Sequence, residues 1–428
     1  MTLDWWFSFI PAVLLLGWAW FSSHIFRSWL APSAFWSGYW ALALILPLIL
    51  AADADYWPGA SWAILLLSLF FSLGTNLCGV ISVHNSRIGS QKTKSSTTWA
   101  MFWGKQVLWG CILVGFASSA ILIFRAGYSL SILLRPQLLF QVGLSYASRR
   151  YAYGESIPIV ILLNTFMYLG GFVGGTWFGI QRSWRKRILG GLGLLPGLLQ
   201  AILVNARTGM IWLLIFFIAS YASVLVLVKH HRRLITPKRI LLIATCAGLL
   251  IGFYFSLQLI REAESVQSAP TSAAKTWVSV ISPPYVFSYW FRENWDHMQP
   301  SWGTKTFNGF FSLLGFSDAQ ALGWEPSSFL GYTPNVYSAL RQLIEDFTFP
   351  GSLFVLLLTG MIVGTAYHRV IRGNVSWLPI LALYYAVVLG SYLANWLNYT
   401  SLFVAWLMFV CISYLLPLRR TDLVIGSV

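Results

Sequence analysis

Charged residues are scarce in this sequence. They make up 10% of the 428 residues, against roughly 25% in an average soluble protein. Hydrophobic residues make up 57%, and the mean hydropathy is +0.68. Together these values exclude a soluble enzyme and an intrinsically disordered chain.

Cysteine and metal-binding patterns are equally sparse. The four cysteines, at positions 78, 111, 246 and 411, all fall within apolar runs, so we expect neither a disulfide framework nor a zinc site. The nucleotide-binding pattern G-x-x-x-x-G-K-[ST] and the zinc pattern H-E-x-x-H are both missing from the sequence. We therefore expect no metal and no cofactor.

Long apolar runs are what the sequence does contain. Runs of about 20 residues are long enough to cross roughly 30 Å of hydrocarbon. They predict an all-α polytopic membrane protein, because the strands of a barrel would alternate polar and apolar residues. We place eleven transmembrane helices at about 5–24, 34–52, 60–83, 100–124, 157–180, 188–204, 209–228, 239–257, 350–368, 377–396 and 399–417.

The basic residues give these spans a direction. With the N-terminus outside, 18 of the 28 Lys and Arg residues fall on the inner side, and 12 of the 13 acidic residues fall outside. This is the positive-inside pattern, so the net charge of +15 indicates topology and not nucleic-acid binding. The predicted organisation has three parts: 1–257 with eight spans and an interfacial segment at about 125–156, a large outer loop at 258–349, and 350–428 with three spans and a cytoplasmic tail.

Any chemistry is expected on the outer side. No Asp, Glu, Arg or His lies at the centre of a span, which argues against an ion-coupled carrier. The outer side carries ten basic residues, and eight of them are Arg, whose planar fork binds phosphate oxygens in pairs. Aromatic residues run through the large loop, so we expect most of it to fold, apart from a small polar stretch at 262–276.

Two arginines are predicted to lie at or near the outer membrane surface, where they could contact a lipid-linked phosphate. Arg207 and Thr208 occupy a very short outer turn, so the Arg207 side chain either snorkels to lipid headgroups or contacts a substrate phosphate. A helix beginning at 333–334, with Thr as N-cap and Pro at its first position, would put Tyr337, Arg341 and Glu345 on one face. Either Arg341 and Glu345 form a surface pair, or Glu345 or Asp346 orients Arg341 toward the membrane.

Three further basic residues and one histidine complete the candidates. Arg149 and Arg150 end an apolar stretch that begins at Pro136 and is typical of a helix lying in the membrane interface. Arg292 lies among aromatic residues that either stack on sugar rings or pack on the membrane. His297 is the only histidine on the outer side.

Three motifs, taken in order, resemble those of the Wzy-type oligosaccharide repeat-unit polymerases, the O-antigen polymerases of bacteria. The segment Ser-Trp-Gly-Thr-Lys-Thr-Phe-Asn-Gly at 301–309 is similar to the family's Gly-x-x-Thr-Phe-x-Gly, and 205–209 to its Arg-Thr/Ser outer turn. The stretch from Asn335 through Arg341 to Phe347 and Gly351 is similar to its Asn-x-Tyr-Thr…Arg…Asp-Phe-Gly segment. The chain departs from that pattern at Thr348-Phe349-Pro350, where the family turns directly through Gly.

The resemblance implies a fold of the GT-C-like, metal-independent membrane glycosyltransferase class in the bacterial inner membrane, with a site that faces the periplasm. It implies that an undecaprenyl-pyrophosphate-linked oligosaccharide is transferred as a block onto a second lipid-linked repeat unit, with membrane lipids and a chain-length regulator as further partners. It implies a site in which Arg207 and Arg341 bind the donor pyrophosphate. The remaining residues that we assign to this site are Arg149, Arg150, Arg292, Thr208, Asn335 and Tyr337, with His297 or an acid such as Asp346 activating the acceptor hydroxyl.

Three other functions compete with this one. An O-antigen ligase would use the same donor but a lipid-core acceptor. A flippase or transporter for lipid-linked oligosaccharides would need a polar cavity through the spans, which Lys105, Asn164 and Gln200 alone hardly provide. A non-enzymatic assembly scaffold would tolerate the loss of the outer arginines.

Overall fold

The computed structural model describes residues 3–86, 99–153, 158–204, 207–228, 269–316, 329, 331 and 338–415. Almost all of these residues are helical or in short turns between helices. The chain divides into two compact units. The first is formed by 1–92, 226–235 and 274–400, and the second by 93–225, 236–273 and 401–428.

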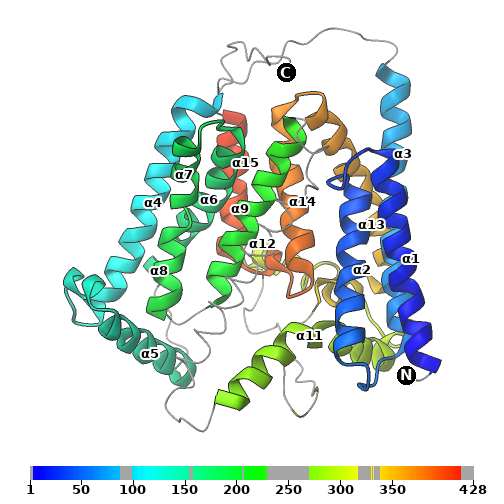
Figure 1. Cartoon of the computed structure of the whole chain (residues 1–428), viewed down its shortest axis with the longest axis horizontal. Coiled ribbons are helices and arrows are strands. Elements are labelled where there is room, and N and C mark those ends of the chain that lie inside the picture. The colour runs from blue at the N-terminus through cyan, green and yellow to red at the C-terminus, as the bar shows by residue number, and fades with distance from the viewer. Residues whose placement is uncertain are drawn as a thin grey trace. The chain divides into compact units, whose positions relative to one another are not determined.

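The first unit is a helix bundle that mixes segments from both ends of the chain (Figure 1). Its long helices are α1 (Leu3–Ile25), α2 (Pro32–Leu50), α3 (Pro58–Ser86), α11 (Ala269–Asn294) and α13 (Ala339–Ile371). Its shorter elements are α12 (Asn308–Leu313), α14 (Leu378–Ser391) and the single turns η4 (Val375–Trp377) and η5 (Trp396–Asn398). In its core, Phe71 stacks between Trp36 and Tyr384, with ring centroids 4.7 and 5.6 Å away.

Tyrosine hydroxyls form hydrogen bonds with backbone carbonyls inside this apolar bundle. Tyr384 Oη donates to the Pro32 carbonyl at 2.7 Å, Tyr385 Oη to Leu30 at 2.5 Å and Tyr39 Oη to Leu389 at 2.9 Å. These bonds satisfy phenols that would otherwise be buried without a partner. They also fix the start of α2 against α14.

The second unit contains the remaining helices. These are α4 (Trp99–Arg125), η1 (Leu130–Leu134), α5 (Pro136–Tyr153), α6 (Pro158–Ile180), α7 (Trp184–Leu192), α8 (Leu195–Val204), α9 (Arg207–Leu227) and α15 (Thr400–Leu415). Phe172 of α6 stacks on Phe216 of α9 and Phe409 of α15, at 4.3 and 5.1 Å. Asn164 accepts hydrogen bonds from Gln200 at 2.6 Å and from Ser118 at 3.2 Å, so these polar groups satisfy one another.

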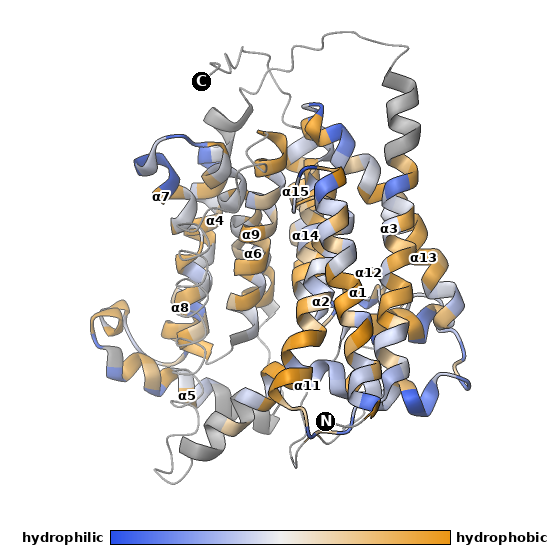
Figure 2. Ribbon diagram, turned by 45° about the vertical axis from the view of Figure 1, so that its right-hand side comes forward, coloured by the Kyte–Doolittle hydropathy of each residue, from blue (hydrophilic) through white to orange (hydrophobic). Residues whose placement is uncertain are grey.

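Helix lengths and surface composition agree with a multi-pass membrane protein. Eight helices among the described residues are long and apolar enough to cross a membrane. Many large apolar side chains on them are exposed, such as Leu113, Phe354 and Ile362. Figure 2 shows hydrophilic residues concentrated near helix ends. The exposed apolar surfaces of these helices are expected to face lipid.

Ten of the eleven predicted spans coincide with helices, and 239–257 lies outside the described residues. The predicted span 188–204 is interrupted at 193–194 between α7 and α8. The last two predicted spans correspond to helices of 14 and 16 residues, which are shorter than expected. The stretch 262–276 was predicted to be flexible, but its part from Ala269 onward forms the first turns of α11.

The predicted interfacial helix is confirmed as a helix, α5, which runs at a steep angle to α4 and α8 (Figure 1). Its apolar face packs on protein: Val142 is buried against the ends of α4 and α8, and Tyr146 Oη donates to the Leu122 carbonyl at 2.8 Å. A Cβ at Gly143 would lie 2.4 Å from the Ile202 carbonyl oxygen, so the crossing with α8 requires glycine. Arg149 and Arg150 occupy the last turns of this helix.

Candidate functional site

The candidate site lies in the first unit, where α11, the turns at 301–307 and the start of α13 meet. Helix α11 rests on the connection between α2 and α3. Tyr285 Oη donates to the Ala51 carbonyl at 2.7 Å, and Ser288 Oγ accepts from the backbone N–H of Trp57 at 2.7 Å. The next turn of α11 then brings the Trp290 ring beneath the start of α13.

Arg341 is the central residue of this site. It is 7% exposed, although its side chain is charged. Its Nε donates to Glu345 Oε1 at 2.8 Å, one helical turn away, and its guanidinium carbon lies 5.0 Å from the centroid of the Trp290 ring. An ion pair and a cation–π contact therefore fix the plane of the guanidinium. The predicted Arg341–Glu345 pair is present, but it is buried and not on the surface.

Lys305 is a second cation of this cluster. Its Nζ lies 3.1 Å from Glu345 Oε2, so the two oxygens of one carboxylate bind two different cations. Glu345 itself is largely buried, with 13% of its side chain exposed. The carboxylate thereby sets the separation of the Arg341 and Lys305 side chains.

Asp346 shapes the turns that carry Lys305. Its side chain is fully buried and accepts from Ser301 Oγ at 2.5 Å, from Lys305 N at 3.0 Å and from Thr306 N at 2.5 Å. The segment is tight, because Trp302 has φ +52° and the following glycine has φ +89°. Of the two carboxylates considered as partners of Arg341, only Glu345 binds it in the described structure. Asp346 is a positioning residue for the loop.

Helix α13 bends sharply just after these residues. Thr348 has φ +60° and ψ 173°, which is not helical, and Pro350 follows. Ser352 Oγ donates to the Leu343 carbonyl at 3.0 Å, although nine residues of straight helix would separate them by about 13.5 Å. The polar start of α13 therefore lies across the adjoining end of the apolar span, and Arg341 remains close to that end.

Side-chain amides in η5 and at its N-cap form hydrogen bonds with the residues around the cluster. Asn395 Nδ2 donates to the Thr306 carbonyl at 2.8 Å, and the side-chain amides of Asn398 and Gln342 pair at 2.8 Å. Gly309 of α12 packs so closely on η5 that a Cβ would lie 2.5 Å from the Leu397 carbonyl oxygen. These contacts attach the turns at 301–307 to η5 and to the start of α13.

The other predicted residues of the first unit lie at the surface. Arg292 pairs with Asp55 at 3.3 Å, with 51% and 84% of the two side chains exposed. His297 is exposed, with its Nε2 3.6 Å from Asp296 Oδ1. Nearby, a hydrogen bond to Glu293 raises the pKa of the exposed Tyr289 phenol. Arg292 and His297 are not bonded to the Arg341 cluster in the part of the chain that the structure describes.

Two further residues predicted for this site precede α13. Asn335 and Tyr337 lie outside the described residues. The helix predicted to begin at 333–334 begins instead at Ala339, because Ser338 is its N-cap and its Oγ accepts from Leu340 N at 3.2 Å. The predicted helix face is therefore observed for Arg341 and Glu345.

Four predicted residues belong to the second unit. Arg207 is the first residue of α9, and Thr208 beside it is exposed. Arg149 and Arg150 are the other two, and they lie in α5.

Trp290 and Lys305 were not predicted as site residues. Trp290 was one aromatic among several in 289–295, and no local pattern shows that this ring lies under an arginine 51 positions later. Lys305 stands inside the motif at 301–309, which was a usable signal.

Neither a family model nor a curated protein nor a solved structure matches this chain.

Proposed function

We propose that this protein is a glycosyltransferase of the repeat-unit polymerase type, which joins lipid-linked oligosaccharides at the outer surface of the bacterial inner membrane. The observation that carries the proposal is Arg341. It is a buried guanidinium held by Glu345 and Trp290 beside the end of an apolar span. A fixed cation at that depth suits a diphosphate attached to a lipid.

The chemistry requires such a cation. The acceptor hydroxyl attacks the anomeric carbon of the donor sugar, and the bond between that carbon and the pyrophosphate oxygen breaks. The electron pair leaves with undecaprenyl pyrophosphate, whose negative charge grows in the transition state. A preorganised guanidinium stabilises this charge without reorganising. His297, with Asp296 beside it, is our candidate to accept the hydroxyl proton.

The bend of α13 gives separate support. The motif resemblance has glycine directly after Asp-Phe, whereas this chain has Thr348. Thr348 adopts φ +60°, a conformation that glycine favours and β-branched residues avoid. The backbone thus makes the turn that the pattern suggests, even though the residue differs.

The test is Arg341→Lys in a strain that lacks the chromosomal copy, with the surface polysaccharide resolved on a gel. Lys keeps the charge but loses the fork, and the loss of one charge-assisted contact of about 1.5–3 kcal/mol slows the transfer roughly 10- to 150-fold. Long-chain ladders should shorten or vanish. Arg135→Lys is the matched control, because Arg135 is exposed and is also predicted to lie outside.

Two outcomes would count against the proposal. Unchanged ladders in Arg341→Lys, at equal protein level, would remove Arg341 from the reaction. A deletion strain separates a polymerase from a ligase, because loss of a polymerase leaves lipid core capped with a single repeat unit. Lipid core with no repeat unit at all would indicate the ligase.

A further inference from the structure

The connection between α6 and α7 carries concentrated positive charge. Arg182, Arg185 and Lys186 are exposed, and Arg187 is half-buried. The stretch 93–225 contains a single acidic residue, Glu155, against eleven basic ones. Within the described part of the chain, none of these four cations forms a salt bridge with a carboxylate. Their charge is therefore available to an anion from outside the protein.

Helix α7 is built to lie at a membrane surface. Trp184 and Ile188, one turn apart, are 66% and 46% exposed, while the exposed Arg185 flanks this stripe and the exposed Lys186 lies on the opposite side of the helix. Three cations in the first turn oppose the helix macrodipole, which favours acidic residues there. Helix stability alone does not explain this arrangement. An apolar stripe beside cations is typical of a helix in contact with lipid headgroups.

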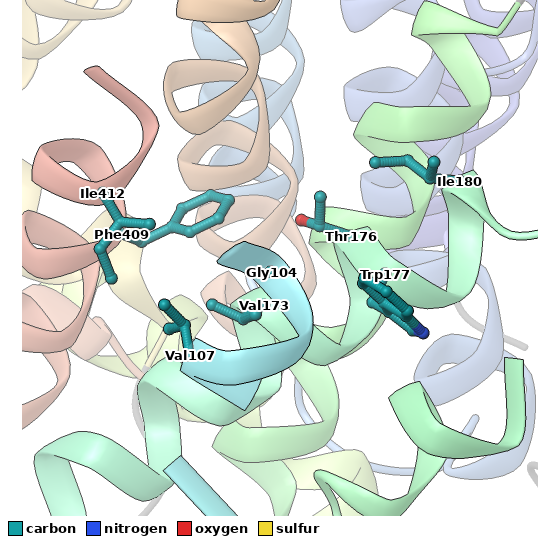
Figure 3. A pocket seen from close by; sticks show the side chains of 8 residues that line it. All are labelled: Gly104, Val107, Val173, Thr176, Trp177, Ile180, Phe409 and Ile412. Atoms are coloured by element: carbon teal, nitrogen blue, oxygen red, sulfur yellow. The ribbon is translucent and has the colours of Figure 1, made fainter. Parts of the chain in front are cut away.

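An apolar pocket lies next to this helix, within the same unit (Figure 3). Its walls come from α4, α6 and α15 and include Val107, Val173, Ile180 and Phe409. Thr176 supplies a hydroxyl, but this donates to the Phe172 carbonyl at 2.9 Å. The pocket thus suits an apolar group that makes no hydrogen bonds.

Direct contacts join the pocket to the basic segment. Trp177, which lines the pocket, donates from Nε1 to the Lys186 carbonyl at 2.9 Å. Arg187 Nε donates to the Gln181 carbonyl at 2.6 Å, and its guanidinium carbon lies 5.7 Å from the centroid of the Phe178 ring. Gly190 also packs closely on Gly174, where a Cβ would lie 2.6 Å from a carbonyl oxygen. These contacts therefore hold the backbone at 186–190 and the Arg187 side chain relative to the pocket.

We infer that this surface binds one anionic phospholipid of the membrane, with its phosphate on Arg182, Arg185 and Lys186 and one acyl chain lying against the apolar mouth of the pocket. Charge complementarity selects the headgroup, because anionic lipids attract basic segments at the predicted cytoplasmic side. The apolar pocket favours a phospholipid over a soluble phosphate. The assignment is independent of the proposed glycosyl transfer.

The test uses the purified full-length protein, delipidated in detergent and titrated with phosphatidylglycerol or phosphatidylcholine of the same chain length. Phosphatidylglycerol should raise the thermal unfolding midpoint by roughly 1–2 °C at about ten times its Kd, and phosphatidylcholine should not. Arg182→Gln, Arg185→Gln and Lys186→Gln should each weaken phosphatidylglycerol binding roughly fivefold.

Two matched controls separate this site from general surface charge and general lipid contact. Arg369→Gln with Arg372→Gln removes two basic residues predicted to lie on the same side, at the end of α13, and should leave the phosphatidylglycerol effect intact. Val107→Phe fills the pocket and should reduce the effect, whereas Leu113→Phe, on an exposed part of α4, should not.

Three results would overturn the inference. The first is an equal response of the wild-type protein to the two lipids, which needs no variant to fold. The second is an undiminished phosphatidylglycerol response after removal of the three cations. The third is an equal loss of that response in the Arg369→Gln, Arg372→Gln control, which would indicate only a non-specific charge effect.

Discussion

Asp346 illustrates how one buried carboxylate organises a loop from a distance in sequence. It accepts three hydrogen bonds from Ser301, Lys305 and Thr306, all at least 40 residues away. A charged acceptor strengthens each bond relative to a neutral one. The position of Lys305 beside Glu345 therefore depends on the buried Asp346 carboxylate.

Replacement of Asp346 by Asn should destabilise the protein by about 3 kcal/mol, because three charge-assisted bonds become neutral and one amide N–H faces another donor. Thermal unfolding in detergent measures the effect. Asp55→Asn is the control, since Asp55 forms a surface pair of little energetic value. Equal stability of the two variants would contradict the positioning role of Asp346.

Thr348 should be replaceable with a gain in stability. Its conformation costs a non-glycine residue about 1–3 kcal/mol. Thr348→Gly should therefore stabilise the protein by about 1 kcal/mol, after the entropy that glycine loses on folding. Thr365→Gly, in a regular part of α13, should destabilise it instead. A shift of the same sign in both variants would show that the bend at Thr348 is not strained.

At the residue scale, local spacing predicted some contacts and not others. The Arg341–Glu345 pair follows from helical spacing and was predictable. The contacts of Arg341 with Trp290 and of Glu345 with Lys305 join segments about 40–50 residues apart. No periodicity encodes such contacts, because tertiary packing decides which side chains meet.

At the scale of elements, α3 and α13 pack through glycine. Gly360 and Gly364 of α13 and Gly74 of α3 face the partner helix, where a Cβ would lie 2.1–2.8 Å from a carbonyl oxygen. The spacing is the small-xxx-small pattern of close helix pairs in membranes. The backbones therefore approach more closely than side chains would allow.

The Gly360→Ala variant should lower the unfolding midpoint, since the added methyl would lie 2.2 Å from the Phe71 carbonyl oxygen and overpacking costs about 1–3 kcal/mol. The control is Gly110→Ala in α4, where nothing lies within 4 Å. That change should be neutral or slightly stabilising, because alanine is a better helix former. An unchanged midpoint in Gly360→Ala would mean that the two helices can separate freely.

There are physical reasons why sequence patterns missed some of the elements. Helix α11 was hidden by its adjacent Pro283 and Pro284 and by its polar start, because both features usually end helices. Helix α13 was predicted in two parts, as a span from 350 and as a separate helix from 333–334 within the outer loop. The apolar pattern changes at the bend, so hydropathy recognised only the part beyond it.

At the scale of the whole molecule, the charge distribution predicts sidedness. Gln299 is exposed near the candidate site and Asn374 is exposed beyond the last turn of α13, and the two are predicted on opposite sides. In a variant without native cysteines, Gln299→Cys should react with a membrane-impermeant maleimide in spheroplasts. Asn374→Cys should react only after permeabilisation. The reverse pattern would invert the topology.

The fold class was predictable because spanning a membrane imposes a strong constraint on length and apolarity. Helix lengths confirm a multi-pass helical protein. The site was predictable only in part, because Arg341 and Glu345 are neighbours in sequence and their other partners are not.

The bend at Thr348 has a consequence for how a ligand arrives. Because the start of α13 lies across its own span, Arg341 stays near the end of that span. Under our proposal, a lipid-anchored donor reaches it by lateral diffusion in two dimensions. The turnover rate should then follow the mole fraction of donor in the bilayer and stay constant when the same vesicles are diluted with buffer.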